Sequence, residues 1–425
     1  MHHSQFRVTG STRALTGSIE VRGAKNDALK AFAASPLFSG PITIKNVPRI
    51  EDIARTCELL RDLGISVRKE SGRMFIVDPH AFRGHMLTSH IAEQLRASIV
   101  LAGPLLARQG VAVFPYPGGC VIGKRPIDIF LDGWKAMGVR VREKGSHYEL
   151  SASRLHGADI TFRTISVTAT ETLMMTAVLA RGTTILRNVA MEPEIPHLAS
   201  FLNASGAHIE GAGTSTIRIV GRRGKLLEGG GTFVTIHDRI EAGSFAILGA
   251  LRGNHLKIKN CNPEHVGALL QMLKDAGAKI RVGTDWIEVS RPAHLKAIDI
   301  KTREYPGFVT DLQAPAMVLL TQARGTSLVF ETIFDGRLNY IHDLNRMGAH
   351  IVMCDPHRAL ASGPTPLHGR ELEGPDLRAG LAFIIAAAIA KGESVIGNAY
   401  QIDRGYEAID RRLRSIGVDI RRETS

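Results

Sequence analysis

The sequence predicts an α/β fold built from six copies of one unit, divided three and three between two domains. Two recurring glycine markers predict the copies, because one follows an amphipathic helix pattern and the other precedes an apolar strand pattern in every copy. The length predicts the two domains, since 425 residues with 44% hydrophobic content exceed what one ordinary core holds.

The helix-ending glycine is the first marker. Helices commonly end at a glycine because it adopts the left-handed conformation without steric cost. A β-rich stretch follows each marker, as in Ile280-Arg281-Val282. Successive markers are separated by 74, 68, 71, 71 and 69 residues, and they are Gly64, Gly138, Gly206, Gly277, Gly348 and Gly417. The near-constant spacing predicts a helix that leads into a strand in each copy.

The strand-opening glycine is the second marker, found at Gly40, Gly110, Gly182, Gly253, Gly325 and Gly392. It precedes the helix-ending glycine of its copy by 24, 28, 24, 24, 23 and 25 residues, so the second copy alone has about four extra residues. These fall around residues 117–123 (PGGCVIG). A long glycine-rich loop on a repetitive scaffold favours a functional role, although an idle surface loop is the alternative.

Composition and charge exclude several classes of protein. The net charge is +12, but the basic residues are dispersed and only 5% of residues are aromatic, which disfavours nucleic-acid binding as the main role. We expect a cytoplasmic protein because no segment reads as a signal peptide or a membrane span. Dinucleotide-binding and P-loop glycine motifs are missing, as is any metal-ligand spacing. Oligomeric state cannot be inferred from the sequence.

Cys120 is the leading candidate for a reactive side chain. Lys124 and Arg125 follow it, and nearby cations favour the thiolate form of a cysteine. The alternative, a small buried hydrophobic residue, better describes the other thiols, Cys57, Cys261 and Cys354. The long loop of the second copy is therefore expected to carry chemistry.

Charged residues stand at the starts of several apolar helix patterns. Lys25 follows a short strand and opens such a helix, so it and the helix N-terminus are suited to hold a phosphate. Arg96 stands before another helix, and similar charges precede or open apolar stretches near residues 238, 311, 337, 378 and 404. Each one alone is more often a helix cap or a solvated ion pair. Together they predict a cleft lined with Arg and Lys that binds a multiply anionic ligand.

The gap between the third and fourth copies contains Gly229-Gly230-Gly231, the best candidate for a linker between the domains. If the N-terminal strand pairs with the second half of the chain, a second crossing falls near Gly23.

Taken in order, these motifs resemble the enolpyruvyl transferase family along essentially the whole chain, and within it the enzymes that act on UDP-N-acetylglucosamine. The motifs that carry the resemblance are GAKN at 23–26, LRAS at 95–98, PGGCVIGKRPID at 117–128, DRIEAG at 238–243, TD at 310–311, DLRAG at 376–380 and IDRGYE at 402–407. The resemblance implies two inverted α/β barrel domains of three repeats each. Residues 1–24 and 237–425 form one, and residues 25–236, with the Cys120 loop, form the other.

The resemblance implies transfer of the enolpyruvyl group of phosphoenolpyruvate to the 3-hydroxyl of UDP-N-acetylglucosamine with release of phosphate, the first committed step of peptidoglycan synthesis. It implies no metal and no organic cofactor. Cys120 would be the proton donor, and Asp311 the carboxylate at the sugar hydroxyl. The cationic and polar residues for the anionic substrates would be Lys25, Asn26, Arg96, Arg125, Arg337, Arg378 and Arg404, with Lys25 and Arg404 in the catalytic set. The UDP-sugar would contact Arg125, Pro126, Ile127, Asp128, Ile129, Thr164, Ile165, Ser166, Val167 and Ile333.

This chain departs from the family pattern at five positions: Asp27, Lys124, Phe130, Thr168 and Gln401. Asp27 and Lys124 replace small residues, Phe130 and Gln401 replace residues that are commonly His, and Thr168 replaces a Gly. These departures leave open a paralogue with another acceptor sugar, and more distantly a silent UDP-sugar-binding protein or a basic nucleic-acid-binding relative. The shikimate-phosphate enzyme of the superfamily is disfavoured because it lacks the loop cysteine.

Overall fold

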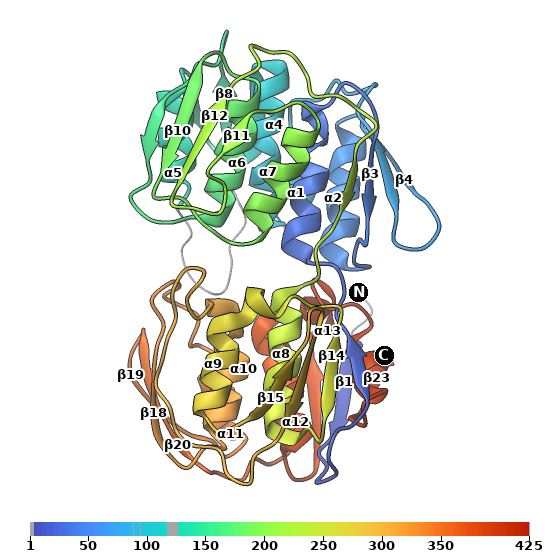
Figure 1. The fold of residues 1–425 in the computed structure, drawn as a ribbon, viewed down its shortest axis with the longest axis vertical. Coiled ribbons are helices and arrows are strands. Elements are labelled where there is room, and N and C mark those ends of the chain that lie inside the picture. The colour runs from blue at the N-terminus through green and yellow to red at the C-terminus, as the bar shows by residue number, and fades with distance from the viewer. Residues whose placement is uncertain (1–3, 88, 94, 117–125, 425) are drawn as a thin grey trace. The chain divides into compact units, whose positions relative to one another are not determined.

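The computed structural model describes residues 4–87, 89–93, 95–116 and 126–424, which form two compact units. The terminal unit contains both ends of the chain, up to Arg22 and from His237 onward. The middle unit contains the described residues between them, from Gly23 to Ile236 (Figure 1). Along the described residues the chain therefore passes between the units after Arg22 and after Ile236.

The third copy shows the βαβαββ unit in full. Its elements are β9 (Asp159–Thr161), α6 (Val167–Val178), β10 (Thr183–Arg187), α7 (Glu194–Ala204), β11 (Ile209–Glu210) and β12 (Thr216–Val220). The sheet order is β11-β12-β10-β9, with β9 parallel to β10 and the other pairs antiparallel. Leu186 of β10 lies opposite Ile160 on one side and Ile217 on the other, and all three are buried. Apolar residues thus line the inner face of the sheet.

The other two copies of the middle unit follow the same plan, except that the sheet of the second has three strands, β6-β8-β7, and its described residues form no first strand. The first contains α1 (Lys25–Ala34), the 3-10 turn η1 (Ser35–Leu37), β3 (Ile42–Lys45), α2 (Glu51–Asp62), β4 (Ser66–Lys69) and β5 (Phe75–Asp78). The second contains α3 (Ser89–Ala92), η2 (Arg96–Ser98), α4 (Ile99–Gln109), β6 (Val111–Pro115), α5 (Asp128–Ala136), β7 (Arg140–Lys144) and β8 (His147–Ser151).

The terminal unit contains the remaining three copies. The fourth has α8 (Arg239–Arg252), β14 (Leu256–Lys259), η3 (Pro263–Val266), α9 (Gly267–Asp275), β15 (Lys279–Val282) and β16 (Trp286–Ser290). The fifth has β17 (Ile300–Lys301), η4 (Thr310–Leu312), α10 (Gln313–Leu320), β18 (Gly325–Phe330), α11 (Ile341–Arg346), β19 (His350–Asp355) and β20 (Arg358–Gly363). The sixth has β21 (Glu371–Glu373), α12 (Leu377–Ile389), β22 (Glu393–Gly397), α13 (Ala399–Asp403), α14 (Ile409–Arg414) and β23 (Asp419–Thr424).

Three strands join sheets far from their own place in the sequence. β1 (Ser4–Thr9) lies between β22 and β23 and completes the sixth copy. β2 (Ser18–Glu20) pairs in parallel with β14, and β13 (Thr232–Val234) pairs in parallel with β3. Each of the last two strands ends shortly before the chain passes into the other unit. The strand that precedes copy one, β2, therefore completes the sheet of copy four, and the strand that precedes copy four, β13, completes the sheet of copy one.

The glycine triplet 229–231 is not the linker between the two units. Gly231 O accepts a hydrogen bond from Thr43 N at 2.9 Å, and Gly230 N donates to Pro41 O at 2.6 Å, so both residues belong to the middle unit. β13 follows the triplet and is still paired in that unit, and the division of the chain falls after Ile236. A run of glycines next to a short edge strand resembles a linker in sequence, which explains the wrong interpretation.

The helix-ending glycines have the left-handed conformation that the sequence predicts. All six have positive φ, from 83° at Gly64 to 106° at Gly348. Among the described residues the six sheets remain separate and none closes into a barrel. The predicted α/β class of six repeated units is confirmed, with three sheets in each unit packed around three helices rather than a continuous ring of strands.

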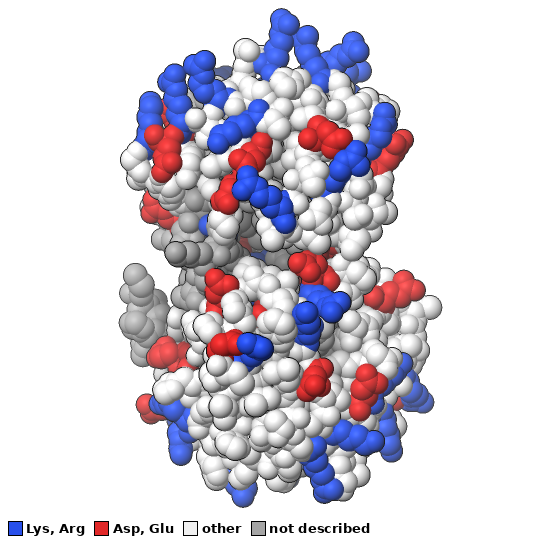
Figure 2. All heavy atoms as spheres, turned by 90° about the vertical axis from the view of Figure 1, so that its left-hand side faces the viewer, with Lys and Arg blue, Asp and Glu red and all other residues white. Residues whose placement is uncertain are grey.

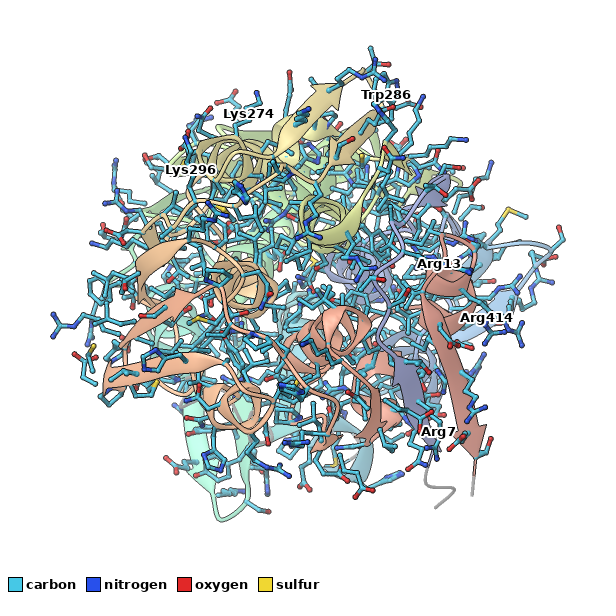
Figure 3. The ribbon with its side chains drawn as sticks, turned by 90° about the horizontal axis from the view of Figure 1, so that it is seen from below. Arg7, Arg13, Lys274, Trp286, Lys296 and Arg414 are labelled. Carbon is cyan, nitrogen blue, oxygen red and sulfur yellow. The ribbon has the colours of Figure 1, made fainter. Side chains whose placement is uncertain are left out.

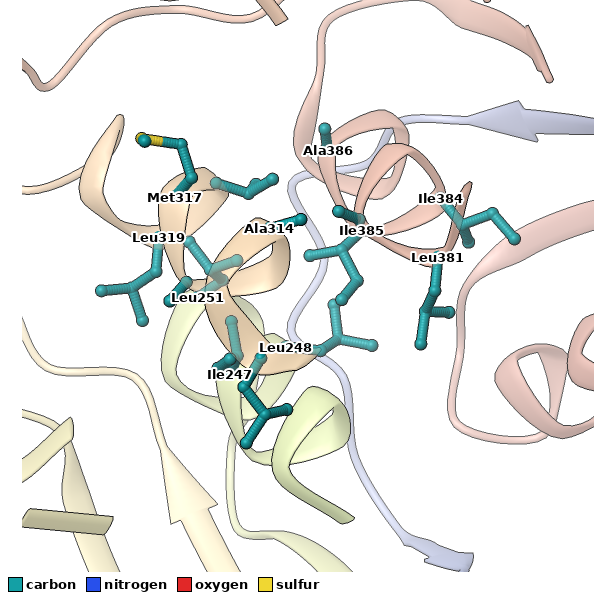
Figure 4. Packing of buried hydrophobic residues seen from close by; sticks show 14 of the residues in the cluster. Ile247, Leu248, Leu251, Ala314, Met317, Leu319, Leu381, Ile384, Ile385 and Ala386 are labelled. Atoms are coloured by element: carbon teal, nitrogen blue, oxygen red, sulfur yellow. The ribbon is translucent and has the colours of Figure 1, made fainter. Parts of the chain in front are cut away.

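Those three inner helices form the core of each unit. They are α1, α4 and α6 in the middle unit and α8, α10 and α12 in the terminal unit, and they are buried on nearly every face. Figure 4 shows Ile247 and Leu251 of α8, Met317 of α10 and Ile385 of α12 within one cluster. No helix in the described part of the chain is long and apolar enough to span a membrane.

The basic charge is dispersed over the face of the molecule that Figure 2 shows. In Figure 2, Lys and Arg are scattered among Asp and Glu rather than gathered in one band. Figure 3 labels Arg7 and Arg414, which lie at the rim of the terminal unit. Arg7 pairs with Glu423 at 2.7 Å and with Glu393 at 2.5 Å across β23, β1 and β22. Neighbouring carboxylates thus offset part of the positive charge locally.

Candidate active site

The candidate residues gather at the N-terminal ends of the inner helices. In the terminal unit, Asp238 is the N-cap of α8, Asp311 lies in η4 just before α10, and Arg378 is the second residue of α12. Arg378 bonds to Asp311, and the charge of Asp238 acts on it as well, so the three helix starts converge. Convergent helix N-termini carry partial positive charge and free N–H groups, which suit an anionic ligand.

The Asp311 carboxylate is held by two guanidinium groups. Arg337 Nη2 lies 2.9 Å from Oδ1, and Arg378 Nη2 lies 3.1 Å from Oδ2. The arginine side chains are 3% and 6% exposed, whereas that of Asp311 is 27% exposed. Arg337 Nε also donates to Thr310 Oγ1 at 3.2 Å. Bonds to both oxygens fix the orientation of the carboxylate while part of it stays open to a ligand.

Tyr406 holds the other side of Arg378. Arg378 Nη1 donates to Tyr406 Oη at 2.8 Å, and burial raises the pKa of Tyr406 to about 12, so the phenol stays protonated. Burial alone would lower the pKa of Arg378, but Tyr406, Asp311 and Asp238 outweigh it and raise that pKa. Arg378 is therefore a permanent buried cation.

Arg404 and Ile333 are placed by neighbouring side chains. Arg404 Nη1 donates to Gln401 Oε1 at 3.1 Å, so the departure at Gln401 supplies a partner for a candidate site residue. The Ile333 N–H donates to Oε1 of the buried Glu331 at 2.9 Å. Oε2 of Glu331 accepts from Thr310 Oγ1 at 3.0 Å, which ties the Ile333 loop to the segment that carries Asp311.

Lys25 opens the first helix of the middle unit. It is the first residue of α1, and its Nζ lies 2.6 Å from Oδ2 of Asp52, which stands in the first turn of α2. Asn26 is half-buried beside it, and Arg96 is half-buried in η2 before α4. The middle unit thus also places its candidate cations at helix starts.

The inner helices of the middle unit lie side by side in register. An added Cβ at Gly103, the fifth residue of α4, would lie 2.7 Å from the backbone oxygen of Thr172 in the sixth position of α6. Lys30, the sixth residue of α1, contacts Glu171 in the fifth position of α6 at 2.7 Å. The three helices therefore pack against one another near the middle of their lengths.

The residues expected to contact the UDP-sugar flank the starts of α5 and α6. Ile127 is the buried N-cap of α5, and Pro126 and Asp128 are exposed on either side of it, with Ile129 half-buried. Thr164 is exposed and Ile165 half-buried, and both precede Ser166, whose Oγ caps α6 by accepting from Ala169 N at 3.3 Å. Val167 and Thr168, both half-buried, are the first residues of that helix. Their binding role stays a prediction.

Phe130 is not part of that surface. It is buried in the core and its ring lies 6.0 Å from that of Trp134. Packing therefore explains an aromatic residue at this position.

Cys120, Lys124 and Arg125 lie outside the described residues. Of the other thiols, Cys57 and Cys261 are buried, and burial raises their pKa values to about 12 and about 11, so they are poor nucleophiles. The expectation that Cys354 is buried is wrong. It is exposed because it lies on β19, an edge strand of its sheet.

Sequence reasoning missed Asp52, Glu331 and the Lys30–Glu171 pair. Asp52 and Glu331 read as ordinary polar residues at a helix start and a strand end. Lys30 and Glu171 offered a signal, because each is a charge within an otherwise apolar helix pattern.

Comparison with known proteins places the whole chain in one group. The family model described as EPSP synthase (3-phosphoshikimate 1-carboxyvinyltransferase) matches residues 9–413. A UDP-N-acetylglucosamine 1-carboxyvinyltransferase from Acidobacterium capsulatum is 44% identical over 418 residues, which are 96% of this chain and 94% of that one. One from Koribacter versatilis is 42% identical over 98% of this chain and 96% of its own.

Solved structures share the fold. The enolpyruvyl transferase NikO from Streptomyces tendae has a TM-score of 0.89 at 24% identity and covers 100% of both chains. EPSP synthase from Acinetobacter baumannii has a TM-score of 0.74 at 18% identity and covers 99% of this chain and 100% of its own.

Proposed function

The chain belongs to the 1-carboxyvinyltransferase family, and on that premise we propose that it transfers the enolpyruvyl group of phosphoenolpyruvate to the 3-hydroxyl of UDP-N-acetylglucosamine and releases phosphate. The product is a precursor for peptidoglycan. Relatives between 41% and 44% identical over nearly the full length carry this name, which supports the UDP-sugar acceptor over a shikimate acceptor.

The reaction is an addition followed by an elimination. A proton is added to the methylene carbon of phosphoenolpyruvate while the sugar hydroxyl loses its proton and its oxygen bonds to the central carbon. The methyl group then returns a proton as the bond to phosphate breaks, which restores the double bond. The steps need an acid, a base near the hydroxyl, and cations for the phosphate and carboxylate.

One observation of this chain carries the proposal: the Asp311 carboxylate, held by two buried guanidiniums at convergent helix starts. A carboxylate fixed in this way can accept the hydroxyl proton once the sugar replaces one arginine partner. Arg378 and Arg404 of the terminal unit would bind the anionic groups of phosphoenolpyruvate and of the intermediate. Cys120 would be the proton donor.

The residues of the middle unit would bind the substrates with them. Lys25, Asn26, Arg96 and Arg125 would hold anionic groups. The segments 126–129 and 164–167, together with Ile333 of the terminal unit, would contact the UDP-sugar. Asp52 would keep the Lys25 ammonium directed by its 2.6 Å ion pair.

Phosphate release by the purified protein tests the proposal. We expect release only when phosphoenolpyruvate and UDP-N-acetylglucosamine are both present, with shikimate 3-phosphate as the control acceptor. No release with the UDP-sugar would overturn the proposed function, and release with shikimate 3-phosphate alone would reassign the acceptor.

A second experiment tests the thiol. Cys120→Ser should lose nearly all turnover and also the covalent labelling by fosfomycin, an epoxide that alkylates this cysteine in the family. Peptide mass spectrometry that found the label on the exposed Cys354 instead would show that Cys120 is the wrong thiol.

A further inference from the structure

Asp27 is a fully buried carboxylate in the first turn of α1, two residues after Lys25. Its Oδ1 and Oδ2 lie 2.9 Å and 3.1 Å from His197 Nδ1, and His197 is in the first half of α7. Oδ2 also accepts from the Ile236 N–H at 2.9 Å. One side chain therefore joins α1, α7 and the segment from which the chain leaves the middle unit.

The Ile236 peptide is bonded to α1 through both of its polar groups. Besides its N–H bond to Asp27, Ile236 O accepts from the N–H of Ala24, the N-cap residue of α1, at 2.7 Å. Ala24 itself offers no capping side chain. The two bonds clamp the departing segment to the helix start that carries Lys25 and Asn26.

The terminal unit contains the same clamp at the other crossing. The N–H of Asp238, the N-cap residue of α8, donates to Arg22 O at 2.8 Å. The Arg22 N–H donates to Oε2 of Glu241, the third residue of α8, at 2.7 Å. Glu241 in turn pairs with Arg412 of α14 at 2.5 Å. The same arrangement thus recurs in both units. In each, the residue at the crossing is bonded to the N-cap residue of a helix and to the carboxylate at the third position of that helix, and the carboxylate has a basic partner.

The basic partners come from equivalent helices. α7 and α14 each precede the helix-ending glycine of their copies, Gly206 and Gly417. This recurrence indicates that the Asp27–His197 contact belongs to the architecture of this chain, although the family pattern has a small residue at position 27. Because the burial of a carboxylate is costly unless it is paired, Asp27 depends on these donors.

We propose that Asp27 and His197 form a positioning pair for the anion-binding start of α1, a proposal that rests on the proposed function. The pair holds the first turn of α1 against Ile236 and so sets the position of Lys25 and Asn26. His197 also gives the Asp27 carboxylate a donor and limits its repulsion of an anionic substrate bound at Lys25. The other charge that acts on Asp27 among the described residues is Glu194 on α7.

Two measurements on Asp27→Ala test the pair. Hydrogen exchange of the Ile236 amide should be faster by about tenfold or more, since its acceptor is lost. The KM for phosphoenolpyruvate should rise by about tenfold, while kcat and the KM for the UDP-sugar change by less than about threefold. Asp27→Asn keeps an acceptor for Ile236 and should restore most of the exchange protection.

His197→Ala should raise the KM for phosphoenolpyruvate in the same selective way, and the double variant should be no worse than Asp27→Ala, because the two residues act as one unit. Asp159→Asn is the matched control, since Asp159 pairs with Arg187 on the surface of the same unit, and it should change none of these quantities.

Wild-type exchange at Ile236 in Asp27→Ala would overturn the clamp, and an unchanged KM for phosphoenolpyruvate would overturn the positioning role. Should Asp27→Ala fail to fold, Asp27→Leu, which also removes the acceptor of the Ile236 N–H, is measured by the same criteria, and His197→Ala decides the positioning role by its KM for phosphoenolpyruvate. If the wild-type protein releases no phosphate, the proposed function fails, and the exchange measurement still decides whether the clamp exists.

Discussion

Replacing Lys30 with methionine should destabilise the middle unit at about pH 8 and leave it nearly unchanged at about pH 5.5. Lys30 Nζ lies 2.7 Å from Glu171 Oε2, and the two side chains are 5% and 0% exposed. Burial raises the pKa of Glu171 from its ordinary 4.5 to about 7, against the opposing effect of Lys30. Methionine keeps most of the side-chain volume but removes the charge that opposes this rise.

The sign follows from where the proton is held. The folded protein keeps the Glu171 proton up to about pH 7, whereas the unfolded chain loses it near 4.5. The contribution of Glu171 to stability therefore falls as the pH rises from 4.5 to 7, by about 3 kcal/mol in total at ~1.4 kcal/mol per pKa unit. Without Lys30 the pKa rises further, but the folded variant can keep Glu171 protonated, so the added loss at about pH 8 is limited to ~1.4 kcal/mol, the cost of holding the proton one pH unit above a pKa of about 7. At about pH 5.5 the carboxyl is neutral with or without Lys30, and the charge-dependent loss should stay below ~0.3 kcal/mol.

Urea unfolding followed by tryptophan fluorescence measures the free energy of unfolding of the middle unit, which contains Lys30 and Glu171. The chain has 2 tryptophans, and Trp286→Phe leaves only Trp134, which is buried in the middle unit and donates to Thr176 on α6, the helix that carries Glu171. Lys144→Met is the matched control. Lys144 pairs with Glu149 at the surface of that unit, so its loss should cost less than ~1 kcal/mol at either pH.

An equal loss for Lys30→Met at the two pH values would refute the reasoning, because the cost would then come from packing and not from the charge of Glu171. The double variant Lys30→Met, Glu171→Gln gives a second check. It should be more stable than Lys30→Met at about pH 8, since folding then no longer has to keep a buried carboxyl protonated above its ordinary pKa.

Three further changes test the site and the core. Asp311→Asn should lower kcat by ~100-fold or more, measured below a melting temperature that falls because two buried guanidiniums lose their carboxylate, and near-normal phosphate release by the folded variant would exclude Asp311 as the base. Gly103→Ala should cost ~1–3 kcal/mol in urea unfolding, because its Cβ would lie 2.7 Å from Thr172 O; an unchanged midpoint would mean that α4 and α6 separate easily. Asp376→Ala should cost ~1 kcal/mol, since Asp376 caps α12 through the N–H groups of Arg378 and Ala379, and no change would show that another group replaces the cap.

The local parts of the fold were predictable from the sequence. A glycine such as Gly64 or Gly348 ends a helix through bonds within one turn, so its spacing identified the copies and the order of helix and strand. The charges at helix starts, among them Lys25 and Asp311, were also visible because capping and helix polarity act over a few residues.

By itself, then, the sequence determined the six copies, their α/β class and the polar residues at the helix starts, because each depends on interactions between near neighbours. Only the tertiary structure decided that β2 joins β14 and β13 joins β3, and that Asp311 meets Arg378, 67 positions further along the chain. The Asp27 clamp on Ile236 spans 209 positions. Contacts of this kind form only when separate helices and sheets pack, and a periodic sequence does not specify which of several similar partners each segment takes.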